Sequence, residues 1–142
     1  MKVINKPISL SEIKKIAKER FGDMVKTKTM SYQHSRLAAG GWKKLSFYEQ
    51  MAHVGSEVER AISWREKGNT TYCQNAFIRA LELLFLTIDF CQKKSRLKEL
   101  TRLYEVLVDD FAGKNEFCSS AKLWRHYFFP FAFAVKDKRN KL

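Results

Sequence analysis

The sequence predicts an all-α protein, an up-and-down four-helix bundle with an additional short N-terminal helix on a linker. Three observations carry this prediction. Apolar residues recur at helical spacing in four successive stretches after residue 41, capping and glycine signals separate these stretches, and no segment alternates apolar and polar residues as a strand would. Because loops of about four to eight residues join the stretches, successive helices should be antiparallel neighbours.

Composition and pattern divide the chain into four parts. They are a short helical segment at 1–26, a linker at 27–41, the bundle at 42–135 and a basic tail at 136–142. In the first part, Ser9 and Glu12 have the spacing of a capping box, and an apolar face follows them. Met30 immediately precedes the stretch that has the pattern of a complete domain, so we expect residues 1–29 to be an appended fragment.

Four helices are expected in the bundle. They should span 47–67, Thr71 to about Lys94, 96–112, and a last stretch that starts after Ser119 or Ser120. Ser46 and Glu49 have capping-box spacing before the first of them. Pro130 should kink or end the last one, because proline lacks the backbone N–H and clashes with the preceding turn.

The most apolar stretch, residues 72–91, is expected to be the helix that the others surround. Its charged residues argue against a membrane-spanning role, so no membrane partner is expected. They belong to one narrow strip at helical spacing, made of Asn75, Arg79, Glu82, Leu86 and Asp89. The strip is either a solvent-facing seam with an Arg79–Glu82 pair or a polar groove for a cation or a basic partner. The seam suits a helix at the edge of a bundle better.

The net charge of +12 is concentrated at the two ends of the chain. Residues 1–44 carry 11 basic and 3 acidic side chains, residues 45–135 carry 12 and 11, and residues 136–142 carry 4 and 1. A basic stripe on a folded surface would indicate a nucleic-acid partner, whereas basic ends are often merely solvated.

The three cysteines show no metal-ligand spacing. Cys73 and Cys91 lie five turns apart on one expected helix, which is about 27 Å of rise and too far for a disulfide. We therefore expect buried free thiols in a reducing cytoplasm.

The last helix is rich in aromatic residues. They include Trp124, Tyr127, Phe128, Phe129, Phe131 and Phe133. One helix face cannot hide all of them, so they either close the bundle entirely or leave a remainder that forms a dimer seam or a docking patch. This excess and the nearly neutral bundle favour a non-enzymatic protein-interaction or dimerisation module.

Nucleic-acid binding is the first alternative. The candidate contacts form a helix-terminal cluster of Lys93, Lys94, Arg96, Lys98 and Arg102. Glu99 and Glu105 dilute the charge of this cluster, so we rank this function below protein interaction.

A metal-binding bundle is the second alternative. Its weak candidate ligands are Glu49, His53 and Glu57, which lie four residues apart in succession and share one helical stripe. Glu82 or Asp89 would have to complete the ligand set, and only one histidine is within reach. We therefore expect His53 to be a partly exposed histidine with a partner on its own helix, and we expect no cofactor.

Two stretches resemble known families. Residues 42–135 carry the pattern "WKKLSFYEQMAHVGSEVERAISWREKGN…AFIRALELLFLTI…RLKELTRLYEVLVDDF", which resembles a family of small uncharacterised bacterial helical proteins and implies no nameable activity. Residues 1–26 contain "ISLSEIKKIAKERFGDMVK", which resembles the opening of a different short uncharacterised bacterial domain family.

In helix lengths and order, the bundle is similar to HEPN-type bundles, which occur in toxin–antitoxin pairs and beside minimal nucleotidyltransferases. The HEPN resemblance would imply, for a ribonuclease, an arginine followed by a histidine four to six residues later on one helix, and neither His53 nor His126 has an arginine at that spacing. Nucleophile-elbow, P-loop and dinucleotide glycine motifs are also missing from the sequence. The sequence therefore favours a function other than catalysis.

Overall fold

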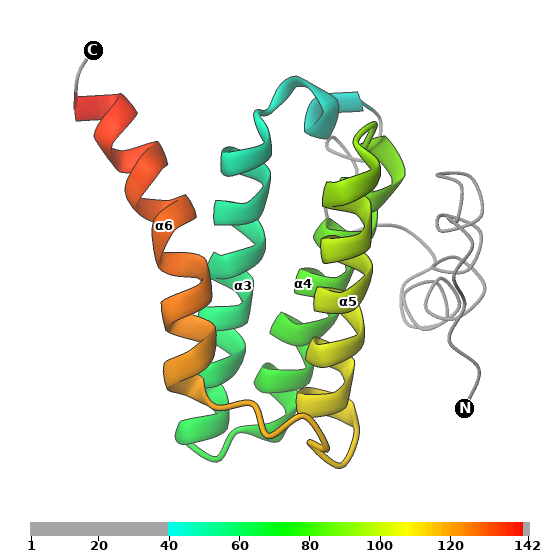
Figure 1. Ribbon diagram of the computed structural model, residues 1–142. Helices are drawn as coiled ribbons and strands as arrows, with labels where there is room; N and C mark the ends of the chain where they lie inside the picture. The colour runs from blue at the N-terminus through cyan, green and yellow to red at the C-terminus, as the bar shows by residue number, and fades with distance from the viewer. Residues whose placement is uncertain (1–39, 141–142) are drawn as a thin grey trace, which may run out of the picture.

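The computed structural model describes residues 40–140, so the expected N-terminal helix and the linker up to residue 39 lie outside the described residues. Its elements are a short 3-10 helix η3 (Trp42–Lys44), then α3 (Phe47–Glu66), α4 (Thr70–Phe90), α5 (Lys94–Ala112) and α6 (Ala121–Asn140). The four long helices alternate in direction (Figure 1), and no strand occurs among residues 40–140. The predicted all-α, up-and-down arrangement is confirmed.

The start of α3 has the capping box that the sequence predicts. The Oγ of Ser46 accepts a hydrogen bond from the backbone N–H of Glu49 at 3.2 Å, and a carboxylate oxygen of Glu49 accepts one from the N–H of Ser46 at 3.1 Å. The two bonds satisfy N–H groups that the first turn of a helix leaves without partners. The bonds from Ser46 lower the pKa of Glu49.

The expected bounds of α4 are wrong by a few residues at both ends. Its N-cap is Asn69 rather than Thr71, and the side chain of Asn69 accepts from the N–H of Tyr72 at 2.9 Å. The helix ends at Phe90, and Lys94 opens α5 instead of closing α4. The backbone is extended at Cys91 and Lys93, which makes the break, and neither glycine nor proline marks it in the sequence.

The core surrounds α4, as expected from its apolar pattern. Thirteen of its side chains, from Cys73 to Ile88, are buried, and they meet buried side chains of α3 and α5. Trp42 of η3 closes one end of this core. Its indole N–H donates to the hydroxyl of Thr87 at 2.9 Å, and its carbonyl accepts from the amide of Gln50 at 2.9 Å.

The last helix, α6, packs mainly against α3. Pro130 does not end it, because the helix continues to Asn140 and takes in residues 136–140 of the expected basic tail. Figure 1 shows α6 close to α3 in its first half and farther from α3 towards its C-terminus. A hollow of about 690 Å³ lies between the part of α6 that follows Pro130 and the first turns of α3.

Candidate protein interface

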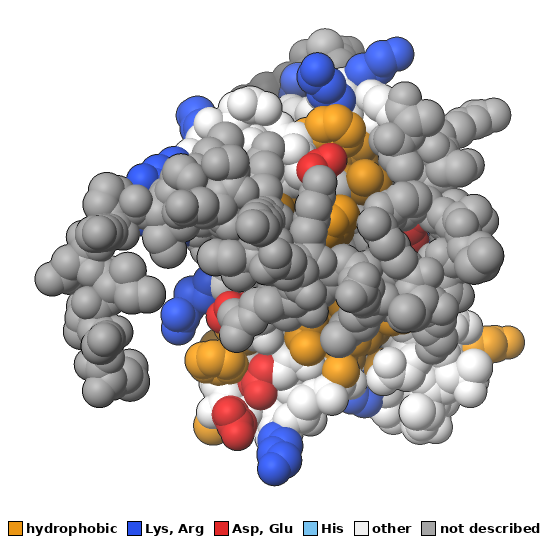
Figure 2. Space-filling view, turned by 90° about the vertical axis from the view of Figure 1, so that its right-hand side faces the viewer, with side chains coloured by type: hydrophobic (Ala, Val, Ile, Leu, Met, Phe, Trp, Pro, Cys, Tyr) orange, Lys and Arg blue, Asp and Glu red, His pale blue; other side chains and the backbone are white. Residues whose placement is uncertain are grey.

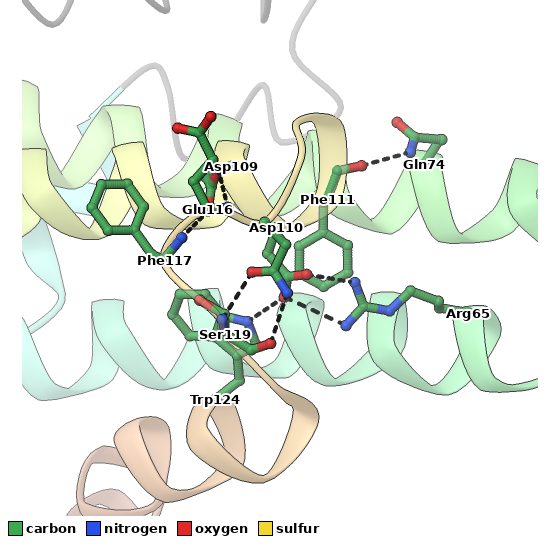
Figure 3. A network of polar contacts seen from close by, with 10 residues as sticks. Arg65, Gln74, Asp109, Asp110, Phe111, Glu116, Phe117, Ser119 and Trp124 are labelled. Carbon is green, nitrogen blue, oxygen red and sulfur yellow. Dashed lines mark hydrogen bonds and ion pairs between the residues drawn. The ribbon is translucent and has the colours of Figure 1, made fainter.

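The loop between α5 and α6 determines where α6 begins. The carboxylate of Asp109 accepts hydrogen bonds from the backbone N–H groups of Glu116 at 2.9 Å and Phe117 at 3.0 Å (Figure 3). The side chain of Asn115, whose φ is 54°, bonds the N–H of Ser119 at 2.8 Å and its carbonyl at 3.0 Å. These bonds fix the loop, so the start of α6 has one position relative to α5.

Asp110 joins three helices at the same end of the bundle (Figure 3). The indole N–H of Trp124 on α6 donates to one carboxylate oxygen at 2.7 Å, and the guanidinium of Arg65 on α3 lies 3.0 Å from the other. The Asp110 side chain is only 5% exposed, whereas that of Arg65 is 37% exposed and also lies 4.2 Å from the centre of the Phe111 ring. We call Asp110, Arg65 and Trp124 the Asp110 clamp.

A glycine allows α6 to approach α3 closely. A Cβ atom added to Gly55 would lie 2.9 Å from two ring carbons of Phe128, which is closer than real Cβ contacts. The Phe128 ring is buried and occupies the space that a larger residue at position 55 would need. Together with the Asp110 clamp, this contact sets the rotation of α6 about its own axis.

This rotation divides the aromatic residues of α6 into two groups. Trp124 and Phe128 are buried, and Tyr127 and Phe131 pack partly buried against the core. Phe129 and Phe133 are 65% and 58% exposed, and their rings stack 5.9 Å apart. We call Phe129 and Phe133 the aromatic ridge.

Tyr127 holds the inner side of α6 to α5. Its O–H donates to the carboxylate of Glu99 at 2.9 Å. Burial, with help from this bond, raises the pKa of Tyr127, so the hydroxyl stays a donor at neutral pH.

A groove runs between α3 and α6 next to the aromatic ridge. It consists of two hollows of about 560 Å³ and 690 Å³ that share Ala52 and Ser56. The smaller hollow is also lined by Gly55, Phe129 and Ala132, and the larger one lies where α6 diverges. We call this feature the α3–α6 groove. Small side chains along it let another backbone approach closely.

Charged side chains lie at both ends of the α3–α6 groove. At the end near the start of α6, the guanidinium of Arg125 contacts Glu59 and Glu66, each at 3.0 Å. These bonds raise the pKa of Arg125. At the other end, the larger hollow is lined by the basic residues Lys138 and Arg139. The smaller hollow is lined by Arg60 as well as by Glu59 and Arg125, so both ends of the groove carry cations beside carboxylates.

The predicted polar strip of α4 is not a solvent-facing seam. Glu82 is fully buried, Leu86 is buried, and Asn75, Arg79 and Asp89 are partly buried. Arg79 pairs with Glu57 of α3 at 3.0 Å rather than along its own helix. The sequence pattern missed this pair because its members are 22 residues apart and on different helices.

The three candidate metal ligands have other roles. Glu49 belongs to the capping box, and buried Glu57 pairs with both Arg60, at 2.8 Å, and Arg79. The exposed side chain of His53 interacts electrostatically with Glu49 on its own helix, and its ring lies 5.6 Å from that of Trp42. Among residues 40–140, no group of three His, Cys, Asp or Glu side chains could hold a metal ion.

The predicted basic cluster is spread along α5. Lys93, Lys98 and Arg102 are exposed, and Lys94 and Arg96 are partly buried. The guanidinium of Arg96 lies 4.2 Å from the centre of the Phe47 ring, and Arg102 lies 5.8 Å from that of Phe117. Lys43 of η3, which the sequence interpretation left out, lines a hollow of about 280 Å³ together with Lys93 and Arg96. Figure 2, which faces the side away from α6, shows basic and acidic side chains near one another.

The cysteines are free, but only one is buried. Cys73 is buried, Cys91 is partly buried and Cys118 is exposed, which corrects the expectation of three buried thiols. Burial raises the pKa of the Cys73 thiol. None of the helices that the structure describes combines the length and apolarity needed to cross a membrane.

Comparison of the chain with family models, curated proteins and solved structures found no match.

Proposed function

We propose that this chain is a non-enzymatic interaction module that binds another protein through the α3–α6 groove and the aromatic ridge. The observation that carries the proposal is the position of Phe129 and Phe133, which are more than half exposed and stacked, with Phe129 also lining the groove. Adjacent exposed aromatic rings beside a groove are typical of a protein-binding surface.

The free energy available from covering the ridge supports this function. A phenylalanine side chain has about 200 Å² of surface, so the two exposed fractions leave about 250 Å² of ring to be covered. At about 25 cal/mol per Å², covering it would contribute about 6 kcal/mol before the costs of association. That gain is large enough to make the ridge the centre of an interface.

The chemistry of the α3–α6 groove favours binding over catalysis. Glu59 and Glu66 are held by Arg125, and Glu49 is held by the capping box, so the carboxylates along the groove serve the fold. The spacing of four residues between Phe129 and Phe133 is the spacing of anchors in helix-to-groove recognition. A helix with one apolar face is the partner element that fits this surface.

Photo-crosslinking of the full chain in the cells that express it tests the proposal. A photoreactive amino acid at Phe133 should give a discrete adduct, whereas the same group at Leu123 should give none. Leu123 is the matched control because it is 57% exposed on the same helix but lies about 120° around α6 from Phe129 and about 15 Å along the helix from Phe133. Equal adducts at both positions, or none at either, would show that the ridge is not a binding surface.

The exposed thiol of Cys118 bears on the cellular compartment in which the module works. Cys118 is an exposed free thiol, which in an oxidising compartment would tend to cross-link copies of the chain or to be oxidised. We therefore propose that the module works in the reducing cytoplasm.

Nucleic-acid binding, of the kind found in HEPN-like toxin–antitoxin proteins, is the second candidate. It is favoured by the convergence of Lys43, Lys93 and Arg96 from two elements on one hollow. Binding of RNA or DNA that weakens steeply with salt, and weakens further in Lys93→Glu but not in Lys67→Glu, would support it. Binding that is unaffected by Lys93→Glu would exclude this hollow as the site.

A further inference from the structure

We propose that residues 10–21 of this chain form an amphipathic helix that covers the outer side of α4. This surface lies apart from the α3–α6 groove, so its occupant is independent of the proposed function. Residues 1–29 would then belong to the domain, whereas the sequence pattern predicts an appended fragment.

The described helices account for two sides of α4. Phe77 stacks on a ring of α5 at 5.3 Å, and Thr87 accepts a hydrogen bond from the indole of η3, which is itself bonded to α3. At 100° per residue, Glu82 lies about 140° around α4 from both Phe77 and Thr87. Ile78 and Leu86 lie one turn before and one turn after Glu82 on this third side. The last helix does not cover it, because α6 packs against α3.

The third side of α4 is nevertheless buried. Glu82 is fully buried, and Ile78 and Leu86 are 7% and 5% exposed. A helix at the edge of a four-helix bundle normally has one side in solvent, and burial all round indicates a further neighbour. Figure 2 shows hydrophobic side chains on the side of the bundle away from α6. Because the described helices leave this side of α4 open, the residues that bury it lie outside 40–140.

The charge of this side favours a basic occupant. Glu82 and Asp89 are two acidic side chains of α4, and Arg79, its one cation, is held in an ion pair with α3 at 3.0 Å. Residues 1–39, in contrast, carry nine basic and three acidic side chains. The segment that precedes η3 is therefore complementary in charge to the outer side of α4.

Residues 10–21 also have the pattern and the length that this side requires. Apolar residues recur there at spacings of three and four and share one helical face: Leu10, Ile13, Ala17 and Phe21. A helix of these 12 residues is about 18 Å long, and α4, with 21 residues, is about 31 Å long. Residues 22–39 can span about 60 Å when extended, which is enough to reach any part of α4 from η3.

Thiol labelling of the full chain in a Cys118→Ser background tests for this cover. A cysteine at Leu86→Cys should react slowly, and adding Ile13→Asn should speed its reaction about tenfold or more, because the buried isoleucine contributes to docking. Lys15→Asn is the matched control, because Lys15 lies about 160° around the expected helix from Ile13 and should leave the rate unchanged. Native Cys73, about 140° around α4 from Leu86, should stay protected in every variant.

Three results would overturn the inference. The first is rapid reaction of Leu86→Cys in a chain with an unchanged N-terminal segment. The second is an equal rate in the Ile13→Asn and Lys15→Asn variants. The third is protection of Leu86→Cys that increases with protein concentration, which would assign the cover to a second copy of the chain.

A second measurement locates the segment without altering its apolar face. A spin label on Lys15→Cys in the Cys118→Ser background should broaden the methyl nuclear magnetic resonance signals of Ile78 and Leu86 and leave those of Leu123 sharp. The Cys118→Ser chain treated with the same reagent is the control for labelling at Cys91. Equal broadening at Leu86 and Leu123, or none at Ile78 and Leu86, would show that residues 10–21 do not cover α4.

Discussion

Replacing Asp110 by alanine should weaken the attachment of α6 to the bundle. The bond from the Trp124 indole ends on a buried carboxylate at 2.7 Å, and hydrogen bonds to charged groups contribute about 1.5–3 kcal/mol. The Arg65 side chain is 37% exposed, so solvent screening limits its ion pair to at most about 1 kcal/mol. We expect Asp110→Ala to lower the free energy of unfolding by about 2–4 kcal/mol, a large share of the stability of a small domain.

Two further variants separate the contributions to the decrease in unfolding free energy that Asp110→Ala should cause. Asp110→Asn keeps an oxygen that can accept from Trp124 but removes the charge, so it should cost less than Asp110→Ala. Trp124→Phe keeps most of the ring packing and removes the donor. A double-mutant cycle between Asp110→Ala and Trp124→Phe should therefore give a coupling free energy of about 1–2 kcal/mol.

Urea unfolding followed by far-ultraviolet circular dichroism measures all four members of this cycle. If Asp110→Ala changed the unfolding free energy by less than about 0.5 kcal/mol, the residue would behave like an ordinary surface position and the Asp110 clamp would not hold α6. A coupling free energy of zero between Asp110→Ala and Trp124→Phe would show that the hydrogen bond from the indole does not hold α6.

Three other predictions follow from the described contacts. Gly55→Ala should destabilise the fold by up to about 2 kcal/mol in urea unfolding, because overpacking against Phe128 costs about 1–3 kcal/mol and the better helix propensity of alanine returns about 1. Glu49→Gln should lower stability by about 0.5 kcal/mol at pH 7, because an anion is favoured at a helix N-terminus. The pKa of Glu49 is lowered in the folded state, so its contribution is present above the unfolded pKa and disappears as the pH falls through the folded value. An aromatic disulfide reagent should modify exposed Cys118 rapidly in the native chain and buried Cys73 only on unfolding.

Each of these predictions has a contradicting outcome. Ser56→Ala is the control for Gly55→Ala, because it adds no atom. Equal stability changes in the two variants would show that the Phe128 ring can move away from an added methyl group at little cost. A stability difference between Glu49→Gln and the unchanged chain that persists well below pH 4 would contradict the charge-based explanation. Modification of Cys73 at the rate of Cys118 would show that the core opens at the start of α4.

Local signals in the sequence were sufficient for the helices but not for all of their ends. The Ser46–Glu49 capping box was predictable because both bonds join residues three apart. The break between α4 and α5 was not, because Cys91 and Lys93 are extended without glycine or proline. Pro130 was a misleading stop signal, since a helix can continue past a proline when its backbone adjusts locally.

The candidate interface was predictable only in outline. The excess of aromatic residues in α6 indicated that some would remain outside, but composition does not state which way a helix is turned. Phe129 and Phe133 face outward because Trp124 bonds Asp110 and because Gly55 admits the ring of Phe128. The polar strip of α4 was misjudged for a related reason, since the ion pair of Arg79 involves a residue on another helix.

The two halves of α6 differ in how firmly the rest of the chain holds them. Its buried side chains, Trp124 and Phe128, both precede Pro130, and residues 131–140 include none. Ordering the later half costs conformational entropy that burial within the chain does little to offset. A partner that fills the larger hollow beside this half would supply the missing burial, so binding should stabilise the end of α6. The larger hollow of the groove thus lies beside the half of α6 that contributes no buried side chain to the bundle.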